Sequence, residues 1–252
     1  MVLLESGKLP HKNYLNIWNL SELRGITVTD RQVTLGALTT YTEIQDNETL
    51  RTEFPMLCQA ASETGGLAIQ NRGTIGGNIV NASPAADSPP ALLAYNAELE
   101  FVSTKGSRAV PYHSFHTGYK QMDRRAEELL LAIHLPRGSR DWTHYYRKVG
   151  TRKAQAISKV CFAGAARMKA DQIVDLRIAL GSVAPIPIRC MQTESALRQK
   201  TIDHQTIAAA SSALTTEVAP IDDLRSSRSY RLRVSLNLLE DFVLRLADTG
   251  SV

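Results

Sequence analysis

The stretch of sequence on which the fold assignment depends reads Asn71-Arg72-Gly73-Thr74-Ile75-Gly76-Gly77-Asn78-Ile79-Val80-Asn81-Ala82-Ser83-Pro84-Ala85-Ala86-Asp87-Ser88-Pro89-Pro90. Small and polar residues crowd this stretch, and neither a helical nor a strand period runs through residues 67–90. Such a composition predicts a long loop. Gly73, Gly76 and Gly77 lack the side chains that would keep an anion away from the main-chain N–H groups. The loop therefore has the chemistry of a phosphate cradle.

Polar side chains in the same stretch extend that chemistry. The hydroxyls of Thr74 and Ser83 and the amide of Asn78 can donate to phosphate oxygens. The Asp87 carboxylate can accept from a hydroxyl such as that of a ribose. The spacing matches neither Gly-x-Gly-x-x-Gly nor a P-loop, so a Rossmann or NTPase site is rejected. The residues alone leave two interpretations open, an anion-binding loop and a tight structural turn.

Strands and helices are mixed on the N-terminal side and just beyond this stretch. Period-two patterns predict strands at residues 32–37 and 98–103, and further strand candidates lie at residues 14–20, 110–111 and 128–135. Thr42 is a plausible cap for a helical segment that stops at Gly65. The stretch Arg137-Gly138-Ser139-Arg140 is the predicted domain boundary.

Beyond that boundary, strands come first and helices follow. Three strands are predicted at residues 144–149, 159–168 and 176–181. Helices are predicted at residues 193–198, 205–217 and 232–246, the last from leucines and a valine spaced by three and four. This order predicts an α+β second domain with helices on one face of an antiparallel sheet.

Composition excludes several classes of protein. Of 252 residues, 43% are hydrophobic and 21% charged, which is typical of a globular protein with a substantial core. The net charge of +4 comes from basic residues spread along the chain, so nucleic-acid binding is not expected. Cys58, Cys161 and Cys190 form neither a disulfide framework nor a metal-binding pattern. No apolar run is long enough to cross a membrane, and the N-terminus lacks the basic region and cleavage site of a signal peptide. The sequence therefore predicts a cytoplasmic protein.

The glycine-rich stretch also resembles a known family. Gly73-Thr74-Ile75-Gly76-Gly77-Asn78, followed by Ala82-Ser83-Pro84-Ala85-Ala86-Asp87-Ser88, is similar to the FAD-binding (medium) subunits of molybdenum hydroxylases. That group includes xanthine dehydrogenase and carbon monoxide dehydrogenase. Supporting similarity lies in Phe115-His116-Thr117-Gly118-Tyr119, Glu128-Leu129-Leu130, Tyr146-Arg147-Lys148 and Ala184-Pro185-Ile186-Pro187-Ile188-Arg189.

The resemblance implies a fold. Residues 1–138 would form a two-lobed FAD-binding domain of the vanillyl-alcohol-oxidase-like type. Residues 139–252 would form the C-terminal medium-subunit domain, an antiparallel three-stranded sheet covered by helices. The α+β reading of the sequence agrees with this expectation.

The resemblance also implies a site for FAD. The residues expected to hold its pyrophosphate are Thr74, Ile75, Gly76, Gly77 and Asn78. Asp87 would contact the adenosine side, Leu130 would lie against the cofactor, and Lys148 would bind near the flavin ring. Because a flavin itself accepts and donates the electrons, no catalytic side chain is expected.

The implied function is electron transfer within a complex. A molybdopterin subunit would oxidise the substrate, an iron-sulfur subunit would relay electrons, and FAD in this chain would pass them to NAD⁺ or another acceptor.

Members of the family begin with another Gly-Gly-Thr-Asp phosphate loop, which this sequence is expected to lack, since Met1-Val2-Leu3-Leu4 resembles the segment after it. The alternative is therefore a non-catalytic structural subunit with weak or lost FAD binding. Thr64 stands where some relatives stack an aromatic ring on the flavin, a role that threonine cannot fill.

A basic cluster precedes the last predicted helix and consists of Arg225, Arg228, Arg231 and Arg233. The sequence predicts a solvated helix face here, with docking to an acidic partner subunit as the alternative.

Overall fold

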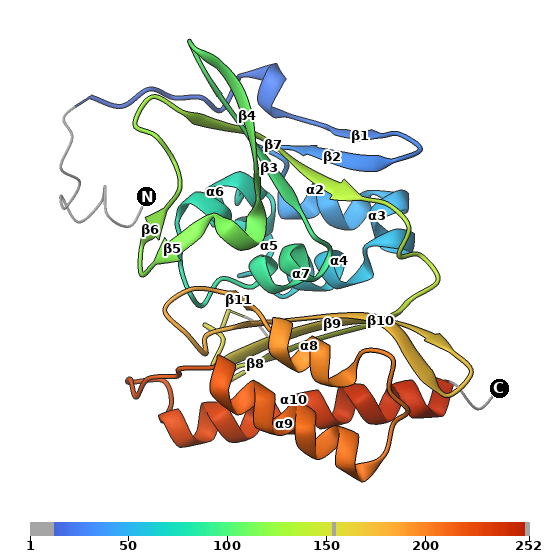
Figure 1. The fold of residues 1–252 in the computed structure, drawn as a ribbon. Helices are drawn as coiled ribbons and strands as arrows, with labels where there is room; N and C mark the ends of the chain where they lie inside the picture. The colour runs from blue at the N-terminus through green and yellow to red at the C-terminus, as the bar shows by residue number, and fades with distance from the viewer. Residues whose placement is uncertain (1–12, 153–154, 250–252) are drawn as a thin grey trace.

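A computed structural model describes residues 13–152 and 155–249 of the chain. The elements stack in four layers: a first sheet, a layer of short helices, a second sheet and a layer of longer helices (Figure 1). Met1-Val2-Leu3-Leu4 lies outside the described residues.

The first sheet is antiparallel and, within the described residues, has five strands in the order β1-β2-β7-β3-β4. Their bounds are Ile26–Val28, Gln32–Gly36, Leu129–Pro136, Glu98–Ser103 and Gly106–Pro111. In β2, Val33 and Leu35 point into the core with period two, as predicted. The small hairpin β5 (His116–Gly118) and β6 (Gln121–Met122) and the 3₁₀ turns η1 (Ser21–Leu23) and η2 (Tyr112–Ser114) complete this part.

The short helices lie beneath this sheet in Figure 1. They are α2 (Tyr41–Asp46), α3 (Glu48–Glu53), α4 (Pro55–Ser62), α5 (Leu67–Gln70), α6 (Ile75–Val80) and α7 (Ser88–Ala94). Thr40 caps α2, because its hydroxyl accepts from the Glu43 amide while the Glu43 carboxylate accepts from the Thr40 amide. The prediction of Thr42 as the cap was therefore wrong by two residues.

Two further predictions for this half are corrected by the structure. Residues 67–90 are not one loop, since α5, α6 and the start of α7 lie within them. Residues 14–20 do not form a buried strand: Leu15 is 87% exposed and Tyr14 is 54% exposed. Apolar composition alone misplaced that segment, because none of the strands that the structure describes pairs with it.

The second sheet is also antiparallel, and its described strands run β11-β10-β9-β8. Their bounds are Ile188–Arg189, Gln172–Gly181, Val160–Lys169 and Thr143–Val149. The prediction of three strands missed β11, a two-residue edge strand too short to show a period. Helices α8 (Met191–Leu197), α9 (His204–Glu217) and α10 (Arg228–Thr249) cover the outer face. None of the helices among the described residues is long and apolar enough to cross a membrane.

Strand β9 connects the two halves because its faces belong to different cores. Cys161, Ala163 and Ala165 point toward α7 and join the core of the first half. Phe162 and Val160 point the other way and join the core under α8–α10. The small side chains on the inner face let α7 lie directly on the sheet. The glycine-rich segments before α7 are thereby brought against the strand ends of the second sheet.

Candidate functional site

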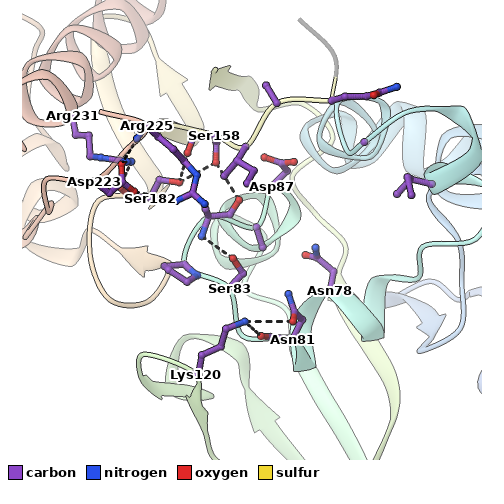
Figure 2. A pocket seen from close by; sticks show the side chains of 18 of the residues that line it. Asn78, Asn81, Ser83, Asp87, Lys120, Ser158, Ser182, Asp223, Arg225 and Arg231 are labelled. Atoms are coloured by element: carbon purple, nitrogen blue, oxygen red, sulfur yellow. Dashed lines mark hydrogen bonds and ion pairs between the residues drawn. The ribbon is translucent and has the colours of Figure 1, made fainter. Parts of the chain in front are cut away.

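A cavity of about 790 Å³ opens where the two halves meet. One wall consists of α5 and residues between Asn78 and Asp87, and the other comes from the segments that precede β9 and follow β10, the segment before α10, and the first turn of α10 (Figure 2). Ser158, Ser182 and Arg231 are polar residues of that second wall. The cavity volume lies within the range of about 300–1,000 Å³ that is usual for cofactor sites.

The main-chain amides of α6 are not free to bind an anion. The Ile75 amide donates to the Thr39 carbonyl at 2.9 Å, and the Gly76 amide donates to the Ala37 carbonyl at 2.9 Å. The next two amides, of Gly77 and Asn78, both donate to Thr74, to its hydroxyl at 3.2 Å and to its carbonyl at 3.0 Å. The prediction that this stretch offers a row of bare amides is therefore wrong for these four positions.

Gly76 has a structural explanation instead. A Cβ atom at this position would lie 2.6 Å from the Ala37 carbonyl oxygen and 2.7 Å from the Ala37 Cβ atom. Only glycine lets α6 approach the end of β2 this closely. Gly77 is different, because a Cβ atom there would meet only the Thr74 hydroxyl within 4 Å.

Asp87 is a buried polar residue of the cavity wall that is held by an ion pair. Its Oδ2 atom accepts a hydrogen bond from Lys148 Nζ at 2.8 Å, and the same ammonium group donates to the Glu63 carbonyl at 2.8 Å. Its Oδ1 atom is buried and has no hydrogen-bond partner among the described residues. Burial raises the pKa of the Asp87 carboxyl to about 6, although Lys148 opposes the rise. A buried acceptor without a partner at a cavity wall is suited to a ligand hydroxyl or N–H group.

The cavity is also moderately cationic. Among the described lining residues, Lys120, Arg225 and Arg231 are positive, and Asp87 and Asp223 are negative. The Arg231 guanidinium donates to Asp223 at 2.8 Å and Arg225 pairs with the same carboxylate at 3.1 Å. Three cations against two carboxylates leave a net charge of +1, which favours an anionic ligand.

Apolar side chains surround the polar wall. Five large apolar residues that line the cavity are at least half exposed, namely Leu67, Ile69, Tyr119, Ile157 and Ile221. Exposed apolar groups gathered at a cavity are typical of a binding surface for flat rings.

The structure brings together only some of the predicted site residues. Asn78 and Asp87 line the cavity, whereas Thr74, Ile75, Gly76 and Gly77, which form the cap and first turn of α6, do not line it. Lys148 reaches the site through Asp87 and its own side chain is only 4% exposed. Leu130 is buried in β7, where it pairs with Phe101 in the core of the first half. Neither Lys148 nor Leu130 lines the cavity, so their contact with FAD stays a prediction.

Sequence reasoning missed three residues of the second wall. Ser158 and Ser182 carry no recognisable pattern, because strand order alone brings them to the cavity. Arg231 is 3% exposed, so the predicted solvated face was wrong for this residue. The helical spacing could have predicted its burial. Arg231, Ser235 and Leu239 are spaced by four residues in α10 and therefore share one face of the helix, which is buried.

The fold and cavity define a class of protein, an α+β chain with a nucleotide-sized cationic cavity between two halves. Comparison with known proteins specifies the class further. Residues 1–138 match the family described as the FAD binding domain in molybdopterin dehydrogenase. Residues 144–246 match the CO dehydrogenase flavoprotein C-terminal domain. The chain belongs to this family, the FAD-binding subunits of molybdenum hydroxylases.

Individual relatives are consistent with this family assignment. The xanthine dehydrogenase FAD-binding subunit of Escherichia coli O157:H7 is 36% identical over 228 residues, covering 89% of this chain and 77% of that protein. The glyceraldehyde dehydrogenase medium chain of Sulfolobus acidocaldarius is 32% identical over 220 residues, covering 87% of this chain and 78% of that protein. A solved structure of carbon monoxide dehydrogenase from Hydrogenophaga pseudoflava superposes with a TM-score of 0.85 at 26% identity, covering 92% of this chain and 80% of the other.

The residues around the cavity fit FAD, the cofactor of this family. Asp87 Oδ1 offers a buried acceptor for the hydroxyl or N–H donors of a dinucleotide. The net positive charge suits its pyrophosphate, and the apolar residues suit its rings. Paired amides in α6 limit the fit, since they leave the anion to side chains such as Asn78 and Ser83.

Proposed function

We propose that this chain is the electron-transferring FAD subunit of a molybdenum hydroxylase complex, and so an FAD-dependent oxidoreductase subunit. When bound, FAD accepts electrons and donates them to an acceptor. The single observation that supports the proposal most is the cavity wall at Asp87, which combines an unpartnered carboxylate oxygen with a net positive surround. The partners are an iron-sulfur subunit and a molybdopterin subunit, the acceptor is NAD⁺ or another oxidant, and the complex acts in the cytoplasm.

In this proposal the side chains divide the work of binding. Asn78 and Ser83 donate hydrogen bonds to the cofactor from the first wall, and Asp87 accepts one. Thr74, Ile75, Gly76 and Gly77 form the start of α6, which leads into that wall, Lys148 holds Asp87, and Leu130 packs in the core of the first half. No side chain needs to move a proton, because the chain binds and orients the cofactor and excludes water from it.

The proposal includes a finer description of the fold. Residues 1–138 are a two-lobed domain of the vanillyl-alcohol-oxidase-like type, and residues 139–252 are a second domain. The first sheet with helices on one face supports the description of the first domain. The separate core under α8–α10 supports a second domain.

A second candidate function is a structural subunit with weak or lost FAD binding. The observation that favours it is the internal pairing of the amides from Ile75 to Asn78, which removes the donors that would hold a pyrophosphate. The two candidates differ in one measurable quantity, the affinity for FAD.

Titration of the purified chain with FAD distinguishes them. Saturating FAD at about 100 times Kd should stabilise the fold by about 2.7 kcal/mol and raise the melting temperature. Ser83→Trp fills the cavity and should abolish this shift, whereas Ser62→Trp, at an exposed site outside the cavity, should retain it. Reoxidation of the chemically reduced bound flavin by NAD⁺ or by a quinone then identifies the acceptor. A chain that assembles with its partners but retains no flavin would support the structural subunit.

A further inference from the structure

We infer that the second sheet and the segments flanking its strands clamp the cavity wall, with Tyr146, Ser158 and Ser182 as positioning residues for the loop of residues 84–87. The inference rests on the proposed function in one respect, that this loop contacts FAD. It assigns a role to the C-terminal domain, namely holding a binding loop that belongs to the other half of the chain.

Three main-chain carbonyls of the loop are held from the second sheet. The Ser182 amide donates to the Pro84 carbonyl at 2.8 Å. The Ser158 hydroxyl donates to the Ala85 carbonyl at 3.2 Å, and the Tyr146 hydroxyl donates to the Asp87 carbonyl at 3.0 Å. Figure 2 shows Ser158 and Ser182 side by side, next to the loop. The loop is therefore bonded at three of four successive residues to β8 and to the segments that flank β9 and β10, all far away in sequence.

The loop has few bonds of its own. The Ala86 amide donates to the Ser83 carbonyl at 3.2 Å, and the Ala85 amide donates to the Ser83 hydroxyl at 3.3 Å. Fixing each residue of a loop in one conformation costs conformational entropy. The hydrogen bonds described above order the loop in the ligand-free protein, so less entropy is lost when a ligand binds. They should therefore strengthen binding although they do not contact the ligand.

The clamp is itself anchored at α10. The Ser182 hydroxyl donates to the Ser158 carbonyl at 3.0 Å, and Ser182 holds a positive φ of 67°. Arg231 donates to the Ser182 carbonyl at 3.0 Å and to the Lys159 carbonyl at 2.5 Å. A buried guanidinium thus fixes the two segments that carry the serines.

Tyr146 acts through Asp87 rather than on the ligand. Its side chain is buried and does not line the cavity, and its hydroxyl also accepts from the Cys161 thiol at 3.1 Å. Burial keeps the pKa of Tyr146 well above its usual value, so the hydroxyl stays a donor. Together with Lys148 on the carboxylate, it fixes both the backbone and the side chain of Asp87.

The neighbouring Tyr145 provides a matched control. Its hydroxyl donates to Asp241 at 2.6 Å, on the α10 side of the sheet and away from the cavity. Tyr146→Phe and Tyr145→Phe each remove one hydroxyl from the same strand. Both should lower the melting temperature slightly. Only Tyr146→Phe should speed hydrogen exchange at the amides of residues 85–88 in the FAD-free chain, and it should raise the Kd for FAD by about three- to tenfold.

The possible outcomes distinguish failure of the clamp from failure of the proposed function. Equal FAD affinity and equal exchange in the two variants would overturn the inference. Faster exchange only in Tyr146→Phe, with no FAD binding by the unaltered chain, would support the clamp and reject the proposed function. Ser158→Ala serves as a second variant if Tyr146→Phe does not fold, and it should produce the same local exchange and affinity changes. Unchanged exchange and affinity in Ser158→Ala would likewise count against the clamp.

Discussion

Lys148 Nζ lies 2.8 Å from Asp87 Oδ2, with the two side chains only 4% and 10% exposed. The pair joins β8 of the second sheet to the residue just before α7. The resemblance implied that these residues serve different parts of FAD, Asp87 the adenosine side and Lys148 the flavin ring. Their contact makes them one unit, in which the lysine neutralises the carboxylate and orients its other oxygen, and the implied contacts of the two residues with FAD stay predictions.

The first prediction concerns the pH dependence of FAD binding. The pKa of Asp87 is raised to about 6 by burial, so the carboxylate that accepts from FAD becomes protonated as the pH falls through that value. The Kd for FAD should therefore rise about tenfold from about pH 7.5 to about pH 5, in proportion to the lost ionised fraction. Fluorescence titration across this range measures the effect. In Asp87→Asn the slope should disappear, and a slope that persists would assign the titration to another group.

Most of the fold was predictable where a segment carries its own period. The strand at residues 98–103 matches β3, and the predicted helix at residues 205–217 differs from α9 by one residue. The prediction of one loop at residues 67–90 failed because α5 and α6 span only four and six residues, too few for a helical period to appear. Their positions depend on distant partners such as the Ala37 carbonyl.

The candidate site was predictable only for its first wall. Asn78 and Asp87 belong to a recognisable stretch and do line the cavity. Ser158 lies just before β9 and Ser182 just after β10, in segments without a recognisable pattern, and they reach the cavity because β9 and β10 pack on α7. Local patterns do not encode such long-range neighbours.

Gly76 provides a second prediction, about stability rather than phosphate access. Gly76→Val should destabilise the fold by about 1–3 kcal/mol or more, because the new side chain would overlap the backbone of Ala37. Gly77→Ala is the comparison variant and should destabilise the fold less, since its Cβ atom would meet only the Thr74 hydroxyl, at 2.9 Å, and no backbone atom. Urea unfolding of the FAD-free chain measures both. Loss of FAD binding in Gly76→Val at unchanged stability would restore the original explanation, a phosphate contact.

Arg231 provides a third prediction. Arg231→Met should lower the free energy of unfolding by about 3 kcal/mol, because Asp223 and two carbonyls lose a buried partner. Arg225 pairs with the same carboxylate, but its side chain is 49% exposed, so Arg225→Met should change stability by no more than about 1 kcal/mol. Chemical denaturation compares the two. Equal effects would mean that Arg231 is not the anchor of this wall.

The small side chains on the inner face of β9 provide the last prediction. Ala163 is fully buried where β9 lies against α7, and α7 begins one residue after Asp87. Ala163→Leu should therefore cost about 1–3 kcal/mol by overpacking and should also displace Asp87. The expected result is a lower melting temperature together with a weaker affinity for FAD. Ala209→Leu, at an exposed position of α9, controls for added bulk and should change neither quantity. A destabilised Ala163→Leu chain that binds FAD with unchanged affinity would show that the position of α7 does not control the cavity.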